Sequence, residues 1–427
     1  MMNDIGAGAT STRKISILIV GLNYVPEPTG ISVYTSGLAD GLKSRGHEVN
    51  VKTGYPHYPA WRIDRRYRGI RRTENINGIE IKRYRHFVPK RASPVGRIAM
   101  EVSFGLSVAF SKWGKNDVII CVSPSLLGST ISILRQRILR TRTPMAIWVQ
   151  DLYSAGVRET DALHGTSASI TTWLESLSLR SFDKVVVIHE RFRKYVENEL
   201  KVNASQIVAI RNWTHVRLPS MPGENSQRKG LSRKGDECIV LHAGNLGAKQ
   251  AMENVIEAAK IAQSKSISVK FVLLGDGNKR AELEEKSRGL ETIEFIDPLP
   301  DHEFMEAIRS ADILLVNEGK GVFEMAVPSK LTTYFASGLP IIAATEAGSI
   351  TASEIEQSGG GIRVDPGSPS ALLRVVEKLQ NDPQAQDRMG TAGRAYSFSK
   401  LSQQSALDDF ETILLAMANN GENRRAT

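Results

Sequence analysis

The sequence predicts an α/β chain built from two doubly wound parallel sheets. Short apolar segments alternate throughout the chain with amphipathic or glycine-ended segments of helical length. A stretch rich in Pro, Gly, Ser and charged residues, residues 214–237, separates two halves of similar size. Strands spaced by helices imply a parallel sheet covered on both faces, and 427 residues are too many for a single core.

Composition favours a cytoplasmic protein. The hydrophobic fraction is 41%, which is ordinary for a globular chain, and the two cysteines lie in apolar runs without metal-type spacing. We therefore expect Cys121 and Cys238 to be buried thiols in a reducing compartment. The apolar segment 15–20 is too short for a signal peptide, and there is no uncharged apolar run of about 18 residues. A membrane-spanning helix is not expected.

The first half begins with a predicted strand at residues 15–20, followed by a loop rich in Gly and Pro. A helix is expected from Ile31 to about Ser44, where Gly46 ends it. Further strands of the first half are predicted at residues 48–52, 118–122, 145–149, 185–188 and 207–210. Those of the second half are predicted at residues 238–241, 269–274, 313–316, 341–343 and 360–364.

Residues 311–343 have the order of one α/β unit and contain the best candidate phosphate site. An apolar strand leads into a glycine-bearing loop, Pro328 and Ser329 open a helix, and Gly338 closes it. Such a loop presents unpaired backbone N–H groups and the positive end of a helix dipole. Ser329 can cap the helix and Lys330 adds a positive charge. An ordinary strand–helix–strand connection is the alternative.

The net charge of +9 is concentrated in a basic stretch, residues 61–91, where eleven Arg and Lys against three acidic residues give +8. This charge suits phospholipid headgroups, a pyrophosphate or nucleic acid, and a solvated loop is the alternative. No nucleic-acid-binding motif accompanies it. We therefore predict contact with an anionic membrane surface, without nucleic acid. The arginines expected to make this contact are Arg65, Arg66, Arg68, Arg71 and Arg72.

An apolar helix is predicted directly after the basic stretch. Ser93 and Pro94 are a helix start, and residues 95–110 are apolar almost all round. Such a helix is expected to be buried in its domain. Its position beside the arginines leaves open a helix that lies against a bilayer.

Four stretches, taken in order, carry a family resemblance. They are Asn-Tyr-Val-Pro-Glu-Pro-Thr-Gly at 23–30, Val-Gln-Asp-Leu at 149–152, Arg-Asn-Trp at 211–213, and Pro-Ser-Lys-Leu at 328–331 with Ala-Ser-Gly-Leu-Pro at 336–340. The chain resembles a retaining glycosyltransferase of family 4, closest to those of colanic-acid-type exopolysaccharide assembly. The resemblance implies the GT-B fold, with two Rossmann-like domains facing a central cleft. It divides the chain into an acceptor-side domain (1–213), the linker (214–237), a nucleotide-sugar domain (238–395) and a C-terminal helix and tail (396–427).

The resemblance also implies roles for individual residues. Those expected to act in catalysis are Asp151, Lys249, Lys330 and Glu324. Those expected to bind the nucleotide sugar are Gly30, Gly244, Asn245, Gly275, Gly277, Ser329, Leu331 and Thr333. A lysine has a purpose in such a site, because the leaving nucleoside diphosphate gains negative charge in the transition state. Two alternatives stay open: Lys249 as a solvated helix residue and Asp151 as a helix cap.

The sequence departs from the family pattern at its glutamate pair. The two positions, eight residues apart, fall at Met325 and Thr333, with Glu324 beside the first and Glu318 further off. Asn245 stands where many members have Arg or Lys. These departures leave open a catalytically degenerate scaffold protein of polysaccharide assembly. An epimerase of the same architecture is a further alternative.

The activity implied is transfer of a sugar from a UDP- or GDP-linked donor to a polyprenyl-diphosphate-linked saccharide. The protein would work peripherally on the inner face of the cell membrane, in exopolysaccharide, capsule or O-antigen biosynthesis. Neither a metal nor a cofactor is expected. There is no Asp-x-Asp in a suitable loop, and lysines can neutralise the diphosphate.

Overall fold

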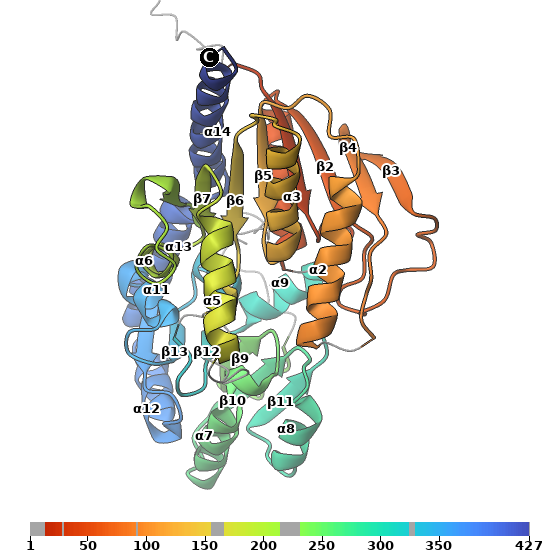
Figure 1. Ribbon diagram of the computed structural model, residues 1–427. Coiled ribbons are helices and arrows are strands. Elements are labelled where there is room, and N and C mark those ends of the chain that lie inside the picture. Colours follow the sequence, from red (N-terminus) through yellow and green to blue (C-terminus); the bar gives the residue numbers. More distant parts are fainter. Residues whose placement is uncertain are drawn as a thin grey trace, which may run out of the picture.

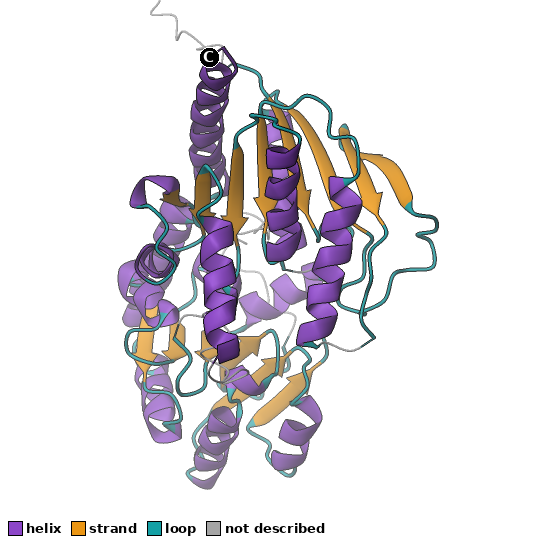
Figure 2. Cartoon of the chain, viewed as in Figure 1, coloured by secondary structure: helices purple, strands orange, loops and turns teal. Residues whose placement is uncertain are grey.

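The structure, a computed structural model, describes residues 13–27, 30–90, 93–154, 166–213, 231–323 and 329–426. These residues form two sheets, one above the other, each covered by helices (Figures 1 and 2). The order of the first sheet is β3-β4-β2-β1-β5-β6-β7-β8. Its strands are β1 (Ser16–Gly21), β2 (Glu48–Gly54), β3 (Arg71–Ile76), β4 (Ile79–Tyr84), β5 (Val118–Val122), β6 (Met145–Val149), β7 (Lys184–Val187) and β8 (Ile207–Ala209).

The second sheet has the order β11-β10-β9-β12-β13-β14 and is parallel throughout. Its strands are β9 (Cys238–Ala243), β10 (Val269–Leu274), β11 (Ile293–Ile296), β12 (Ile313–Asn317), β13 (Ile341–Ala344) and β14 (Gly361–Val364). In both sheets the chain reverses its direction of growth next to the first strand. Ligands of open α/β sheets bind at the carboxyl ends of the strands at such a point.

The helices connect the strands as the alternating pattern predicts. Those of the first half are α1 (Ile31–Ser44), α2 (Pro94–Ala109), α3 (Leu126–Ile138), α5 (Thr166–Leu179) and α6 (Glu190–Asn198). Those of the second half are α7 (Glu253–Ser264), α8 (Arg280–Lys286), α9 (Asp301–Ser310), α10 (Ser329–Ser337), α11 (Ile350–Ser358), α12 (Pro369–Gln380), α13 (Pro383–Lys400) and α14 (Gln403–Ala426). The predicted linker lies mostly outside the described residues.

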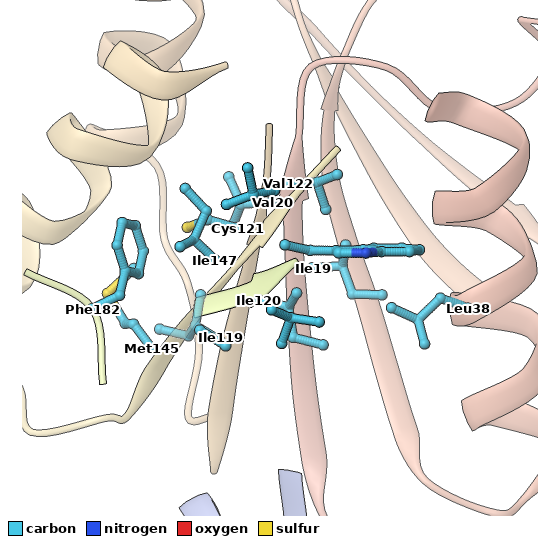
Figure 3. Packing of buried hydrophobic residues seen from close by; sticks show 14 of the residues in the cluster. Ile19, Val20, Leu38, Ile119, Ile120, Cys121, Val122, Met145, Ile147 and Phe182 are labelled. Atoms are coloured by element: carbon cyan, nitrogen blue, oxygen red, sulfur yellow. The ribbon is translucent and has the colours of Figure 1, made fainter. Parts of the chain in front are cut away.

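The core of the first domain is rich in Ile and Val side chains on the inner strands, to which helices and loops add residues such as Leu38 and Phe182 (Figure 3). The register pairs Ile19 with Ile120, and Cys121 with both Val20 and Ile147. Cys121 and Cys238 are buried, free thiols, as expected. Burial of these side chains is the main favourable term in folding, because each removes apolar surface from water.

The last helix joins the core of the first domain. After α13 the chain crosses back, and Phe410, Leu414 and Met417 of α14 are buried with the first-domain core. In Figure 1, α14 stands behind the first sheet while α2, α3 and α5 lie side by side in front of it. Arg45 fixes α14 by ion pairs of 2.6 Å to Asp408 and to Glu411. Residues 403–426 therefore complete the first domain, although they follow the second in sequence.

The basic stretch is not one loop, which corrects that alternative. It contains the antiparallel hairpin β3–β4, whose turn is Asn77-Gly78 with φ of 54° and 77°. An Asn-Gly dipeptide with both residues at positive φ is a strong hairpin signal, and it was available in the sequence. Arg83 is fully buried and donates to Glu74 at 2.7 Å, so this arginine cannot face a membrane. The five named arginines are all exposed.

Helix α2 is not wholly buried, which corrects the first expectation for it. Its Ser93 caps the first turn by accepting from Gly96 N at 3.1 Å. One face packs inward, with Phe104 and Val108 buried. The other face stays apolar but exposed, including Ile98 at 53% and Phe110, the residue after the helix, at 89%.

Candidate active site between the two domains

Two loops of the second domain meet at the carboxyl ends of β9 and β10. Gly244 and Gly275 have φ of 139° and 143°, a region that L side chains rarely adopt. A Cβ on Gly275 would lie 1.9 Å from Gly244 O, and a Cβ on Gly277 would lie 2.4 Å from Leu246 O. Glycine is therefore required at positions 275 and 277 by the contact between the loops themselves.

A lysine with a lowered pKa lies beneath the Gly244 turn. Lys330, in the first turn of α10, places Nζ 3.1 Å from Nε2 of His242 on β9. His242 Nδ1 lies 3.1 Å from Leu315 O and donates to it, which leaves Nε2 as the acceptor for Lys330. Burial lowers the pKa of His242 well below its usual value, and the charge of Lys330 lowers it further. Burial likewise lowers the pKa of Lys330 to about 8, against the opposing charge of Glu318.

Glu318 follows β12 and is the described carboxylate next to Lys330. It accepts hydrogen bonds from the hydroxyls of Thr345 and Thr351, the latter at 2.8 Å. Burial raises its pKa, although these hydrogen bonds and Lys330 favour the ionised form. The predicted Glu324 lies outside the described residues.

Helix α10 presents the predicted binding residues in two ways. The side chains of Leu331 and Thr333 are buried within the domain, so a ligand would meet the backbone of Leu331 in the first turn. Ser329 begins the helix, and its side chain is not described. The N–H groups of this first turn have no carbonyl partner within the helix, which is the local feature that suits an anion.

Lys249 lies on a short 3₁₀ helix, Ala248–Gln250, and its side chain is exposed. Asn245 Nδ2 and Gly247 N both donate to Gln250 Oε1 at 3.2 Å. Asn317, at the end of β12, donates to Gln250 O at 2.7 Å. The predicted Asn245 therefore helps to shape the loop that carries Lys249. We call Gly244, Lys249, Gly275 and Lys330 the second-domain edge.

The first domain has a pocket of about 300 Å³ at the carboxyl ends of β1, β5 and β6. We call it the first-domain pocket. Gly30 lines it as the N-cap of α1, with φ of 65° and open space where a Cβ would stand. Asp151 lines it two residues after β6. Both predicted residues of the first domain therefore lie in one pocket, at the reversal point of its sheet.

Burial raises the pKa of two carboxyl groups in the first-domain pocket. Burial raises the pKa of Asp151, against the charges of Arg97 and Lys249. Burial also raises the pKa of Glu101 to about 7, although the Tyr153 hydroxyl and Leu127 N, at 3.0 Å, donate to it. The effect of Lys249 on Asp151 crosses from one domain to the other. The structure thus brings these two predicted residues to a common site.

A buried glutamate joins the two domains beside this site. Glu354 of α11 is 2% exposed and lies 2.9 Å from His189 Nε2 of the first domain. Arg211 of the first domain also donates to it, and Tyr396 OH donates at 3.1 Å. Burial opposes ionisation, yet His189 and Arg211 hold the pKa of Glu354 below its usual value. These contacts between α11 and the first domain hold the second-domain edge and the first-domain pocket in position relative to each other.

Sequence reasoning missed three groups of this site. His242 had a signal, since it is the one polar residue of an apolar strand that ends at a glycine turn. Glu318 had one in its position directly after β12. Glu101 had a weaker one, as the single charged residue between Arg97 and Phe110. Its burial depends on how α2 packs, which the sequence does not state.

The described residues contain neither a cluster of metal ligands nor a helix that could span a membrane. No group of three or more His, Cys, Asp or Glu side chains within the described ranges is arranged to hold a metal ion. Within the same ranges, each helix is too short or too polar to cross a bilayer.

Comparison with known proteins identifies the class. Residues 29–213 match the family model described as a glycosyl transferase 4-like domain, and residues 224–396 match the model of glycosyl transferases group 1. The solved structure of Alr3699/HepE from Anabaena in complex with UDP superimposes with a TM-score of 0.65 at 13% identity, over 94% of this chain and all of that one. The chain is therefore a glycosyltransferase built from these two domains, with the GT-B fold.

The curated relatives of the chain are named as glycosyltransferases, one of them for colanic acid biosynthesis. The chain is 29% identical over 419 residues to WcaI of Escherichia coli (strain K12), a protein named for colanic acid biosynthesis. That match covers 93% of this chain and 98% of WcaI. It is 24% identical to WbjE of Pseudomonas aeruginosa, named as a glycosyltransferase, over 63% of this chain and 67% of WbjE. The protein is therefore a glycosyltransferase of polysaccharide biosynthesis.

Proposed function

We propose that the protein transfers a sugar, with retention at the anomeric carbon, from a UDP- or GDP-linked donor to a lipid-linked saccharide. The observation that carries this proposal is Lys330, a cation held beneath the Gly244 turn in the first turn of α10. Glu318 only partly offsets the desolvation of the Lys330 charge, so an added anion would stabilise the charged lysine. A diphosphate is the anion that the solved relative with UDP binds.

The second-domain edge and the first-domain pocket would have different roles in the reaction. As the glycosidic bond to the diphosphate breaks, negative charge grows on the leaving oxygen, and Lys330, Lys249 and the α10 backbone stabilise it. Gly30 leaves room for the donor or acceptor opposite them, and Asp151 faces the transferred sugar. Because these cations supply the neutralising charge, we propose that turnover needs no divalent metal. Loss of turnover in EDTA, with recovery on adding Mg²⁺ or Mn²⁺, would contradict this part.

The test is donor hydrolysis by the purified full chain across a panel of UDP- and GDP-sugars. Release of UDP or GDP from one or more members, abolished in Lys330→Ala, is the expected result. Binding of UDP or GDP without hydrolysis, and without transfer to polyprenyl-diphosphate-linked saccharides, would favour the scaffold alternative. Conversion of the donor to an isomeric nucleotide sugar without any acceptor would favour an epimerase.

A lipid-linked acceptor requires approach to a membrane, and two surface features support it. The five exposed arginines of the basic stretch supply charge, with about 1 kcal/mol for each one near an anionic leaflet. The helices α2, α3 and α5, which lie in front of the first sheet in Figure 1, add exposed apolar side chains. These residues are Val95, Ile98, Leu106, Leu134, Ile138, Ile170, Trp173 and Leu177. Basic charge beside exposed apolar and aromatic groups is the composition of a membrane-surface contact.

Flotation with vesicles tests the membrane part. We expect binding to anionic vesicles that weakens with salt, and weakens strongly when Arg65, Arg66, Arg68, Arg71 and Arg72 are all changed to Gln. Arg374→Gln, Lys378→Gln and Arg388→Gln together, exposed in the second domain, serve as the matched control and should change little. Equal flotation with neutral and anionic vesicles would rule the idea out.

A further inference from the structure

Two side-chain amides form a linked pair in the wall of the first-domain pocket. Gln150 directly follows β6, Asn212 lies after β8, and both line the pocket. Asn212 Nδ2 donates to Gln150 Oε1 at 2.8 Å. Gln150 is 4% exposed. The other two polar atoms, Gln150 Nε2 and Asn212 Oδ1, are buried and have no hydrogen-bond partner among the described residues.

The pair is held rigidly by aromatic packing. Trp148, two residues before Gln150, stacks on Trp213, the residue after Asn212, with ring centroids 5.9 Å apart and planes at 21°. Both rings are buried. The backbone N–H of Gln150 also donates to Ser123 Oγ at 2.8 Å. The orientation of both amides is therefore set before any ligand arrives, which lowers the entropy lost on binding.

The two unpaired atoms indicate which chemical group a ligand would place beside them. Two amides joined by this hydrogen bond leave one NH2 group and one carbonyl oxygen without partners, and turning both amides together only exchanges the two positions. Buried polar atoms without partners cost stability, and here a donor and an acceptor on two linked side chains both belong to the wall of the pocket that holds Asp151, so one ligand group can satisfy both. The group that accepts from one atom and donates to its neighbour is a hydroxyl. Asp151 follows Gln150 directly, next to the reacting centre proposed above.

We propose that Gln150 and Asn212 together bind a saccharide hydroxyl and so select the sugar at the site. This inference rests on the proposed function and adds a substrate contact to it. The shared chemistry is a sugar hydroxyl held by a donor and an acceptor. It belongs either to the transferred sugar of the donor or to the terminal sugar of the acceptor.

Near-isosteric variants separate binding from folding. Gln150→Met and Asn212→Leu remove the amides with little change of volume, and the double variant removes both partners at once. Gln150→Glu keeps an oxygen for Asn212 but replaces the donor NH2 by a second oxygen and adds an ionisable group. The matched control is Gln136→Met, since Gln136 on α3 is also buried with an unpaired Oε1. It lies near Met145, at the opposite end of β6.

Three measurements are made on each full-length variant. They are the Kd of UDP and GDP, the KM for the UDP- or GDP-sugar that wild type hydrolyses, and the KM for an alkyl glycoside acceptor panel. We expect unchanged nucleoside diphosphate binding in every variant, and one of the two KM values raised about tenfold by each single change. A raised donor KM assigns the hydroxyl to the transferred sugar, and a raised acceptor KM assigns it to the acceptor. Gln136→Met should match wild type throughout.

The inference is overturned if both KM values stay within about twofold of wild type while UDP and GDP still bind. It is also overturned if the single variants lose only thermal stability and the double variant regains it with normal kinetics, because the pair would then be structural. A wild-type protein that neither binds nucleoside diphosphates nor turns over any donor would instead refute the proposed function, and this inference with it.

Discussion

The two edges that face each other across the domain boundary are built from opposite chemistry. The second-domain edge has glycine turns, the cations Lys249 and Lys330, and the open first turn of α10. The first-domain pocket has amides and two carboxyl groups whose pKa values burial raises. The second-domain edge is therefore cationic, with Glu318 only partly offsetting the desolvation of Lys330, and the first-domain pocket disfavours charge on its carboxyl groups.

The difference follows from what burial does to ionisable groups. Desolvation lowers the pKa of Lys330 and raises that of Glu101, so the charged form of each group is disfavoured. A ligand that interacts favourably with these groups would offset this cost. A diphosphate would stabilise the charged lysines of the second-domain edge by supplying negative charge. Saccharide hydroxyls would supply hydrogen-bond donors and acceptors to the polar groups of the first-domain pocket. Four predictions test this contrast, from the largest expected effect to the smallest.

Lys330→Ala should have the largest effect. Removing this cation takes away stabilisation of the leaving diphosphate, roughly 2–4 kcal/mol, or about thirtyfold to a thousandfold in turnover. The melting temperature should not fall, because a desolvated charge is removed with the side chain. Steady-state kinetics measure the loss of turnover, and thermal unfolding measures the melting temperature. Unchanged kinetics would mean that the second-domain edge does not bind the diphosphate.

Glu101→Gln should stabilise the fold at alkaline pH. The folded-state pKa of about 7 lies above the ordinary value of 4.5, so the contribution of Glu101 is fully present below pH 4.5 and is lost as pH rises through 7. At pH 8 the variant should be more stable by roughly 1–3 kcal/mol, with little difference near pH 4.5. Chemical unfolding at both pH values measures this. Equal stability at pH 8 would mean that Glu101 is solvated.

Affinity for UDP or GDP should decline at high pH. With its pKa lowered to about 8, Lys330 is charged below pH 8 and must take up a proton to bind a diphosphate above it. The Kd should therefore rise with pH above 8, by at most about tenfold per unit. Calorimetric titrations across this range provide the measurement. Lys330→Arg, whose guanidinium stays protonated, should flatten the profile, and an equal slope in this variant would assign the effect to another group.

Lys249→Ala should have the smallest effect on donor binding. Its side chain is exposed, so water and salt screen its charge more than that of Lys330. We expect the donor KM to rise by about tenfold at most, with a difference from wild type that shrinks at high salt. Kinetics at low and high salt compare the two proteins. A loss as large as that of Lys330→Ala would show that Lys249 becomes enclosed when the donor binds.

Much of the fold could be predicted from the sequence because its signals are local. Predicted bounds matched the structure at α1, β5, β6 and β10, and lay within one to three residues at most other predicted strands. The hairpin β3–β4 was missed although Asn77-Gly78 marked it, because the basic residues around it suggested a loop. Asp151, Lys249, Lys330 and Gly30 were placed by the family resemblance, and their roles stay predictions.

The sequence by itself determined the alternation of strands and helices, the buried thiols and the family, since each depends on residues close together in the chain. Only the tertiary structure decided that Lys330 is held by His242, that Glu354 clasps Arg211, and that α14 completes the first domain. It also decided that Gln150 meets Asn212, 62 residues further on. Such pairs depend on which strand ends are neighbours in the sheet and on which side chains the packing buries. Neither can be predicted from residues that are close together in the sequence.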